Sequence, residues 1–475
     1  MLNQNQTPLL DALKAHALRP HAAFYTPGHK RGQGISAKLA DCFGSAVFRA
    51  DLTELAELDN LFAPQGVIQA AQQLAAAAFG AAQTWFLVNG STSGIEAAIL
   101  ATCCPGDKII MPRNVHSSAI ASLILSGAQP IFIQPEYDSV LDITHSITAN
   151  AVETALQQHP DAKAVLMVYP TYYGVCGEVA AIASLTHQQN IPLIVDEAHG
   201  AHFAFHPQLP ISALAAGADI SIQSTHKVLG ALTQASMLHL QSDRINIDRI
   251  NKALQLVQST SPSYLLLASL DAARQQMAIH GKQLMSRTLA LAESARTRIA
   301  QIPGLSVFDP DSYTLDKTRL TVTVSGLGLT GYAADEILDQ LGVTAELASR
   351  QNLTFIISLG NTKSDIEQLV QGLTLLAQQP QTPNPLTLNR EPNIPKLSIL
   401  PREAFFAATE TLPLPETSDR ICAELVCPYP PGIPVLIPGE LITSDALEYL
   451  QQVITMGGII SGCADDSLQT LKVIK

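Results

Sequence analysis

The sequence has little charge, few aromatic side chains and no long apolar run. Only 15% of its 475 residues are charged and 5% are aromatic, with Trp85 as the single tryptophan. Because 47% of the residues are apolar, a disordered chain is excluded and a large buried core is predicted. No stretch approaches ~18 consecutive apolar residues, so no membrane span is expected. The first 20 residues also lack the apolar segment of a signal peptide.

Basic residues are outnumbered by acidic ones. The 41 acidic and 28 basic residues give a formal net charge of −13, which argues against a nucleic-acid partner. The negative charge mildly favours a cationic substrate, although many cytoplasmic proteins are equally acidic.

Cysteines are few and scattered. They are odd in number, no pair has the spacing of a zinc site, and no histidine cluster accompanies them. We therefore expect reduced thiols, a cytoplasmic location and no bound metal. The seven cysteines are Cys42, Cys103, Cys104, Cys176, Cys422, Cys427 and Cys463.

Apolar segments alternate with helical patterns along much of the chain. This alternation predicts an α/β fold with a mostly parallel sheet covered by helices on both faces. Ligands of such sheets bind beyond the carboxyl ends of the strands, so the polar residues at those ends predict the site. The predicted strands are residues 84–88, 108–111, 130–133, 164–169, 192–195 and 220–223.

Three regions are predicted along the chain. Residues 1–315 are expected to form an N-terminal segment and a large domain that holds the site, and residues 316–379 a smaller α/β unit. Three prolines within residues 380–385 mark a linker. Residues 380–475 are then a C-terminal α+β domain, in which residues 421–427 are predicted as a strand.

A lysine and an aspartate follow two of the predicted strands. Lys227 ends the run Ser224-Thr225-His226-Lys227, where it is suited to form a Schiff base with a phosphorylated aldehyde cofactor. A snorkelling side chain is the alternative for this lysine. Asp196 is the candidate carboxylate for the ring nitrogen of such a cofactor, although a strand-end aspartate can also simply cap a helix.

The segment after residues 84–88 predicts an anion site. Ser91, Thr92 and Ser93 lie in a turn before a helix predicted to start at Ile95, and the free N–H groups and dipole of a helix start favour a phosphate. Ser224 would add another hydroxyl group. The pattern is weak by itself because serine and threonine also cap helices.

Histidines stand close to three of the predicted strand ends. His116 would place a flat ring against a cofactor, and His199 and His226 lie beside the aspartate and the lysine. For each of them, ordinary packing in the core is the alternative that the residues leave open.

Seven motifs together resemble the Orn/Lys/Arg decarboxylase family, and they follow the family's order over almost the whole chain. This resemblance implies a pyridoxal 5′-phosphate (PLP) enzyme of fold type I, the aspartate-aminotransferase architecture, with its active site at a homodimer interface. The chain is similar to the shorter members, which lack an N-terminal wing domain. The motifs are Thr26-Pro27-Gly28-His29-Lys30, Leu52-Thr53-Glu54-Leu55, Asn89-Gly90-Ser91-Thr92-Ser93-Gly94, Pro112-Arg113-Asn114-Val115-His116, Val195-Asp196-Glu197-Ala198-His199-Gly200-Ala201-His202, Ser224-Thr225-His226-Lys227 and Pro428-Tyr429-Pro430-Pro431-Gly432-Ile433-Pro434.

The resemblance also implies roles for the residues at the strand ends. Lys227 is then the Schiff-base lysine, Asp196 pairs with the pyridine nitrogen, and His116 stacks on the ring, which makes these three the candidate catalytic residues. The candidate cofactor-binding residues are, taken together, Ser91, Thr92, Ser93, His116, Asp196, His199, Ser224, His226 and Lys227.

The reaction implied by the resemblance is decarboxylation of a basic L-amino acid. Arginine, lysine or ornithine would give agmatine, cadaverine or putrescine plus CO₂, within polyamine biosynthesis, and Lys227 or a histidine would protonate Cα. Glu424 is a speculative partner for the cationic side chain, with an ordinary surface glutamate as the alternative. The rival functions are a PLP-dependent aminotransferase or oxidase, and a catalytically silent regulatory protein with the same fold. The intact Lys227 and Asp196 count against the silent protein.

Overall fold

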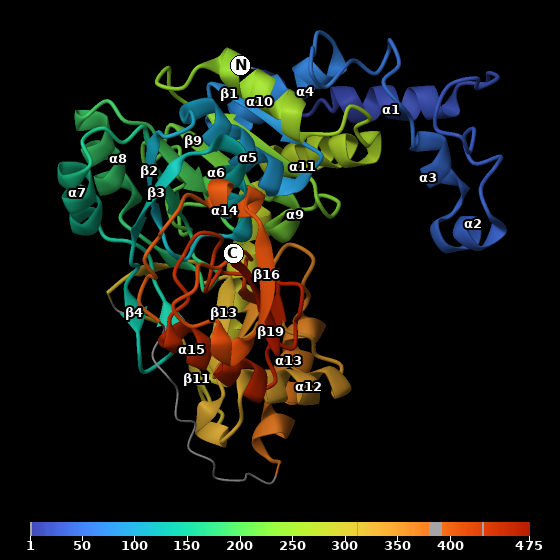
Figure 1. Ribbon diagram of the computed structural model, residues 1–475. Helices are drawn as coiled ribbons and strands as arrows, with labels where there is room; N and C mark the ends of the chain where they lie inside the picture. The colour runs from blue at the N-terminus through green and yellow to red at the C-terminus, as the bar shows by residue number, and fades with distance from the viewer. Residues whose placement is uncertain (1, 311, 380–391, 430–431) are drawn as a thin grey trace. The chain divides into compact units, whose positions relative to one another are not determined.

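A computed structural model describes residues 2–310, 312–379, 392–429 and 432–475 (Figure 1). The chain divides into two compact units, one with residues 1–101 and 195–285 and the other with residues 102–194 and 286–475. The predicted linker at residues 380–385 lies outside the described residues. The three-region division remains a prediction.

In the first unit, the strands follow the order β1 (Gln83–Leu87), β10 (Ser236–Leu240), β9 (Ile220–Gln223) and the end of β8 (Leu193–Asp196). The sequence did not predict β10, which is antiparallel to both β1 and β9. The register places His239 of β10 opposite Thr84 on one side and Ser221 on the other. These three polar side chains therefore share one face of the sheet.

The helices of the first unit include the two that frame the site. Helix α5 follows β1, and the short helix α9 follows β9. Residues 225–228 form a single helical turn directly after β9, and this turn contains Lys227. The helices are α1 (Pro8–Leu18), α2 (Ala37–Phe43), α3 (Ser45–Ala50), α4 (Val67–Phe79), α5 (Gly90–Thr102), α9 (Thr225–Val228), α10 (Ile247–Val257) and α11 (Tyr264–Ile299), the last of which continues into the second unit.

The second unit contains three parallel strands joined by helices. β2 (Lys108–Pro112) lies between β3 (Gln129–Ile133) and β6 (Ala164–Val168) and pairs in parallel with both. Helices α6 (Ser117–Ser126), α7 (Ala149–Gln158) and α8 (Val179–Gln188) connect these segments of the chain. The strand–helix alternation predicted from the sequence is confirmed here.

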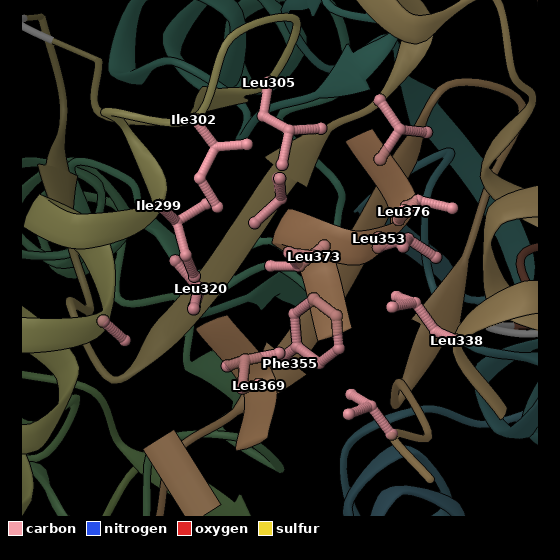
Figure 2. Packing of buried hydrophobic residues seen from close by; sticks show 14 of the residues in the cluster. Ile299, Ile302, Leu305, Leu320, Leu338, Leu353, Phe355, Leu369, Leu373 and Leu376 are labelled. Atoms are coloured by element: carbon pink, nitrogen blue, oxygen red, sulfur yellow. The ribbon is translucent and has the colours of Figure 1, made fainter. Parts of the chain in front are cut away.

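A four-stranded sheet in the second unit has its own hydrophobic core (Figure 2). Its strand order is β11 (Ser306–Val307), β13 (Arg319–Thr323), β15 (Asn352–Ile356) and β14 (Leu347–Ala348). Helices α12 (Gly331–Gln340) and α13 (Lys363–Ala377) contribute Leu338 and Leu373 to this core, beside Leu320, Leu353 and Phe355 of the sheet. The alternation of buried and polar positions along both helices explains why one face of each packs inward.

The remaining part of the second unit is built from short elements. The strand predicted at residues 421–427 is wrong: Ile421 and Val426 form isolated bridges with Leu441 and Leu436, whereas Cys422 bridges Val473 of β19 (Thr470–Ile474). Because the pairing is divided between residues 436–441 and β19, no continuous ladder forms. The elements are β4 (Tyr137–Asp138), β5 (Ile143–Thr144), β7 (Val175–Cys176), β12 (Thr314–Leu315), α14 (Pro401–Phe406), β16 (Thr409–Pro413), β17 (Cys427–Tyr429), α15 (Ser444–Thr455), β18 (Ile459–Ser461) and β19 (Thr470–Ile474).

Candidate active site

Lys227 lies in the single helical turn that follows β9. Ser224 precedes this turn, and the backbone N–H of Lys227 donates to the Ser224 carbonyl oxygen at 3.0 Å. The Nζ atom of Lys227 lies 3.1 Å from Nε2 of His199. The end of β9 and the turn after β8 therefore bring an amine and an imidazole within hydrogen-bonding distance, as strand ends on one edge of a sheet can.

Asp196 is the last residue of β8 and is 8% exposed. The Ala198 N–H donates to its Oδ1 atom at 3.1 Å. Burial raises the pKa of Asp196, and the charge of Lys227 and the Ala198 hydrogen bond partly offset this effect. The charge of Lys227 therefore acts on the Asp196 carboxylate and favours its charged form.

The segment after β1 brings hydroxyl groups to the same unit. Oγ of Ser224 donates to Oγ of Ser91 at 2.7 Å, although 133 positions separate the two residues in the sequence. Thr92 is exposed at the start of α5, whereas Ser93 is buried and its hydroxyl donates to the Gly90 carbonyl oxygen at 2.9 Å. Ser91, Thr92 and Ser224 therefore bring hydroxyl groups together beside a helix start, with Ser224 donating to Ser91, whereas the Ser93 hydroxyl donates to the backbone.

Helix α5 packs closely on the sheet at Gly94. A Cβ atom at this position would lie 2.7 Å from both Ile222 Cγ2 and Leu87 Cδ1. No side chain fits there without movement of the helix, so glycine allows the start of α5 to stay near the ends of β1 and β9.

Two of the predicted histidines have identifiable local contacts. The Nδ1 atom of His226 lies 3.0 Å from the Ala235 carbonyl oxygen. His116, in the second unit, precedes α6, and its Nδ1 accepts from the Ser118 N–H at 3.1 Å. Stacking of His116 on a cofactor ring remains a prediction.

The sequence reasoning missed Glu197, Ser221 and Gln223, which form a buried polar cluster behind the site. Glu197 directly follows Asp196, and its carboxylate accepts hydrogen bonds from both other side chains. A signal was present, because Ser221 and Gln223 alternate with isoleucines in a strand that is otherwise apolar. Polar residues at alternate positions of a buried strand require partners.

Glu424 accepts hydrogen bonds from backbone groups of the second unit. Its Oε1 accepts from the Ala464 N–H at 2.8 Å and its Oε2 from the Lys472 N–H at 2.7 Å. Both carboxylate oxygens therefore already have backbone partners, which weakens this residue as a candidate for binding a cationic substrate.

Two family models match the chain. Residues 7–314 match the major domain of Orn/Lys/Arg decarboxylase, and residues 390–466 match its C-terminal domain. The chain belongs to the Orn/Lys/Arg decarboxylase family. It is therefore an enzyme, a decarboxylase, and the family resemblance predicted from the motifs is confirmed.

Curated relatives extend over the whole chain. The arginine decarboxylase of Bacillus subtilis (strain 168) is 43% identical over 484 residues, which cover 100% of this chain and 99% of that protein. An arginine decarboxylase of Halalkalibacterium halodurans is 42% identical over 486 residues, with coverage of 100% and 99%.

Solved structures show the fold. The constitutive lysine decarboxylase of Escherichia coli superposes with a TM-score of 0.86 at 22% identity, covering 99% of this chain and 82% of that one. An alanine–glyoxylate aminotransferase from Nostoc sp. superposes with a TM-score of 0.52 at 20% identity, covering 65% of this chain and 85% of that one. The predicted α/β architecture of fold type I is confirmed. Within the described ranges, no helix combines the length and apolarity needed to cross a bilayer.

Proposed function

We propose that the chain is a PLP-dependent decarboxylase of a basic L-amino acid, with arginine favoured over lysine and ornithine. The observation that carries this proposal is the position of the Lys227 amine, 3.1 Å from His199 and under the influence of the buried Asp196 carboxylate. Arginine is favoured because three relatives at 41–43% identity are arginine decarboxylases.

The residues present fit this cofactor. The hydroxyl groups of Ser91 and Ser224 meet beside the first turn of a 13-residue helix, a donor set that suits a phosphate group. We assign Ser91, Thr92 and Ser224 to the phosphate through their hydroxyls, and Ser93 through its backbone N–H. Asp196, a buried carboxylate near a lysine, suits a protonated ring nitrogen.

The chemistry of this proposal divides between the cofactor and the chain. When bound, PLP supplies an electron sink for the pair of electrons released as CO₂ departs. Lys227 would hold the aldehyde end, and Asp196 would keep a proton on the ring nitrogen. His116 would stack on the ring, and His226, fixed by the Ala235 carbonyl, would border the site.

Proton transfer falls to Lys227 and His199 in this proposal. Their nitrogen atoms, 3.1 Å apart, lie within the range over which a proton is shared or passed. One of the two therefore returns a proton to the substrate Cα after CO₂ has left. Because CO₂ has left before this proton arrives, the product is an amine, whereas the keto acid of an aminotransferase keeps its carboxyl group.

We also propose a homodimer, a cytoplasmic location and a role in polyamine biosynthesis. Helix α2 supports the dimer, because none of its residues is buried and Leu39 and Phe43 are exposed; apolar exposure of this kind is relieved when a second copy covers it. The seven cysteines form no disulfide, which suits a reducing compartment. Sedimentation of the purified protein tests the dimer directly.

A product assay tests the proposed reaction. The protein is incubated with PLP and with arginine, lysine or ornithine in separate reactions, each labelled with ¹³C at the carboxyl carbon. We expect labelled CO₂ and the matching amine, identified by mass, most rapidly from arginine. A keto acid in place of the amine would make the chain an aminotransferase. No turnover of any of the three amino acids would reject the proposal.

A further inference from the structure

Glu197 is a buried carboxylate for which the proposed reaction has no use. It is 0% exposed and immediately follows Asp196 in the chain. Burial raises its pKa to about 7, although three hydrogen bonds favour the charged form. A carboxylate buried so deeply is costly unless it is paired or hydrogen-bonded.

Three donors from two other segments fasten this carboxylate. Oε1 accepts from the Ala213 N–H at 2.8 Å, and Oε2 accepts from Ser221 Oγ at 2.6 Å and from Gln223 Nε2 at 2.8 Å. The Glu197 N–H also donates to the Ile222 carbonyl oxygen at 2.9 Å. Side chain and backbone of Glu197 are thus both tied to β9, the strand that leads to Lys227.

The hydrogen bonds continue across two more strands. Gln223 Oε1 lies 3.1 Å from His239 Nε2, and His239 Nδ1 lies 2.8 Å from Thr84 Oγ1. Because Gln223 donates its amide N–H to Glu197, its oxygen must accept from His239 Nε2, so Nδ1 accepts from the Thr84 hydroxyl. Burial lowers the pKa of His239 to about 3, which keeps the ring neutral as this arrangement requires.

Glu197 also begins the turn that carries two residues of the site. The Gly200 N–H donates to the Glu197 carbonyl oxygen at 2.9 Å, which closes the turn around His199. Asp196 precedes Glu197, and His199 within the turn lies 3.1 Å from Lys227 Nζ. Any movement of Glu197 therefore moves the carboxylate on one side of it and the imidazole on the other.

We propose that Glu197 is a positioning residue, which ties the turn of residues 196–200 to β9 and so fixes Asp196 and His199 relative to Lys227. This inference rests on the proposed function in so far as these three residues are the working groups. In this role, Glu197 accepts hydrogen bonds from other residues of the chain and does not contact substrate or cofactor.

The test compares Glu197→Ala with Glu197→Gln. Glu197→Ala leaves three buried donors without an acceptor, and we expect kcat and the affinity of the apoprotein for PLP each to fall by about tenfold, with KM for the amino acid unchanged. Glu197→Gln should recover most of both losses. Its amide oxygen can face Ala213, and its NH₂ can face Ser221, while the Gln223 amide turns over and His239 changes tautomer.

Two further variants keep the test decisive. Ser221→Ala removes one of the three donors and should lower kcat and PLP affinity by about threefold, so it replaces Glu197→Ala if that variant does not fold. Thr84→Val, at the far end of the hydrogen-bond chain, is the matched control and should leave both values unchanged. The proposal would be overturned if folded Glu197→Ala had the kcat and PLP affinity of the wild type. The same result in Ser221→Ala would overturn it where Glu197→Ala does not fold. It would also be overturned if Glu197→Gln were as impaired as Glu197→Ala.

The PLP titration separates this inference from the proposed function. It uses the apoprotein and the cofactor alone, followed by visible absorption, and requires no decarboxylation. If the wild-type protein produced no amine, the proposed reaction would fail, while the PLP affinities of the Glu197 variants would still decide the role of Glu197.

Discussion

Each compact unit contains an aspartate with a buried side chain, Asp196 in the first and Asp142 in the second, and the two are held in different ways. In the first unit, Asp196 is buried with one hydrogen bond from Ala198, among the described residues, and with Lys227 as its opposing charge. In the second unit, Arg350 and Asp142 form an ion pair whose side chains are 2% and 8% exposed. Asp142 Oδ2 accepts from Arg350 Nε at 3.0 Å, Gln452 Oε1 accepts from Arg350 Nη1 at 3.0 Å, and the guanidinium lies 4.6 Å from the centre of the Tyr449 ring.

A charge with saturated hydrogen bonds is part of the scaffold, whereas a charge held by few partners is available for chemistry. Desolvation disfavours the charged forms of both Asp196 and Arg350. For Arg350, the partners within its own unit offset most of this cost, whereas for Asp196 they do not. The raised pKa of Asp196 shows that its hydrogen bond and Lys227 do not fully offset the cost of burying the charged carboxylate. Perturbed groups of that kind gather at functional sites, and the following substitutions test whether the contrast holds.

Lys227→Ala should have the largest effect. Loss of a covalent catalytic residue is expected to lower kcat by at least about 10⁴-fold and to remove the visible absorption of bound PLP. Steady-state assays and absorption spectra of the purified variant measure both. Visible absorption like that of the wild type would show that another lysine holds the cofactor.

Asp196→Asn should damage activity and spare stability. We expect kcat to fall by about 10²–10⁴-fold, as for a lost protonating group. Because folding raises the pKa of Asp196, its charged form lowers the free energy of unfolding once the pH exceeds the pKa of the unfolded chain. The uncharged asparagine should therefore leave Tm at pH 8 unchanged or higher. A clear fall in Tm at that pH would place Asp196 with the scaffold charges.

Asp142→Asn should instead lower the stability of the protein. It leaves the buried guanidinium of Arg350 without an opposing charge, and the free energy of unfolding is expected to drop by about 3 kcal/mol. Urea unfolding of the two aspartate variants side by side measures this difference. Equal stabilities would remove the distinction between the two buried aspartates.

Gly94→Ala should have the smallest effect of the series. Its new methyl group would lie 2.7 Å from Ile222 and Leu87, and overpacking of this kind costs about 1–3 kcal/mol. PLP affinity should fall as well, since the start of α5 must move. Gly360→Ala is the matched control, because nothing lies within 4 Å of a Cβ there. If both variants behaved as the wild type, α5 would be less tightly packed than the structure indicates.

Local sequence patterns predicted much of the fold. The strands expected at residues 108–111 and 130–133 are found as β2 (Lys108–Pro112) and β3 (Gln129–Ile133). Apolar periodicity and helix propensity act over a few neighbouring residues, so one chain segment carries the information. The strand predicted at residues 421–427 did not form because its bridged residues divide their pairing between residues 436–441 and Val473 of β19.

Candidate site residues were predictable where a strand ends in an unusual side chain. Lys227 and Asp196 were singled out in this way, and the structure places Lys227 Nζ beside His199. The contacts among them were not predictable. Ser91 and Ser224 are 133 positions apart, and nothing in either segment records that their hydroxyl groups meet.

The sequence by itself determined the strands that alternate with helices, and which reactive side chains follow the ends of those strands. The tertiary structure alone decided that β10 lies between β1 and β9, and that Glu197 meets Ser221 and Gln223. Strand order and register set these contacts, and both depend on how distant segments pack together rather than on the periodicity of any one of them.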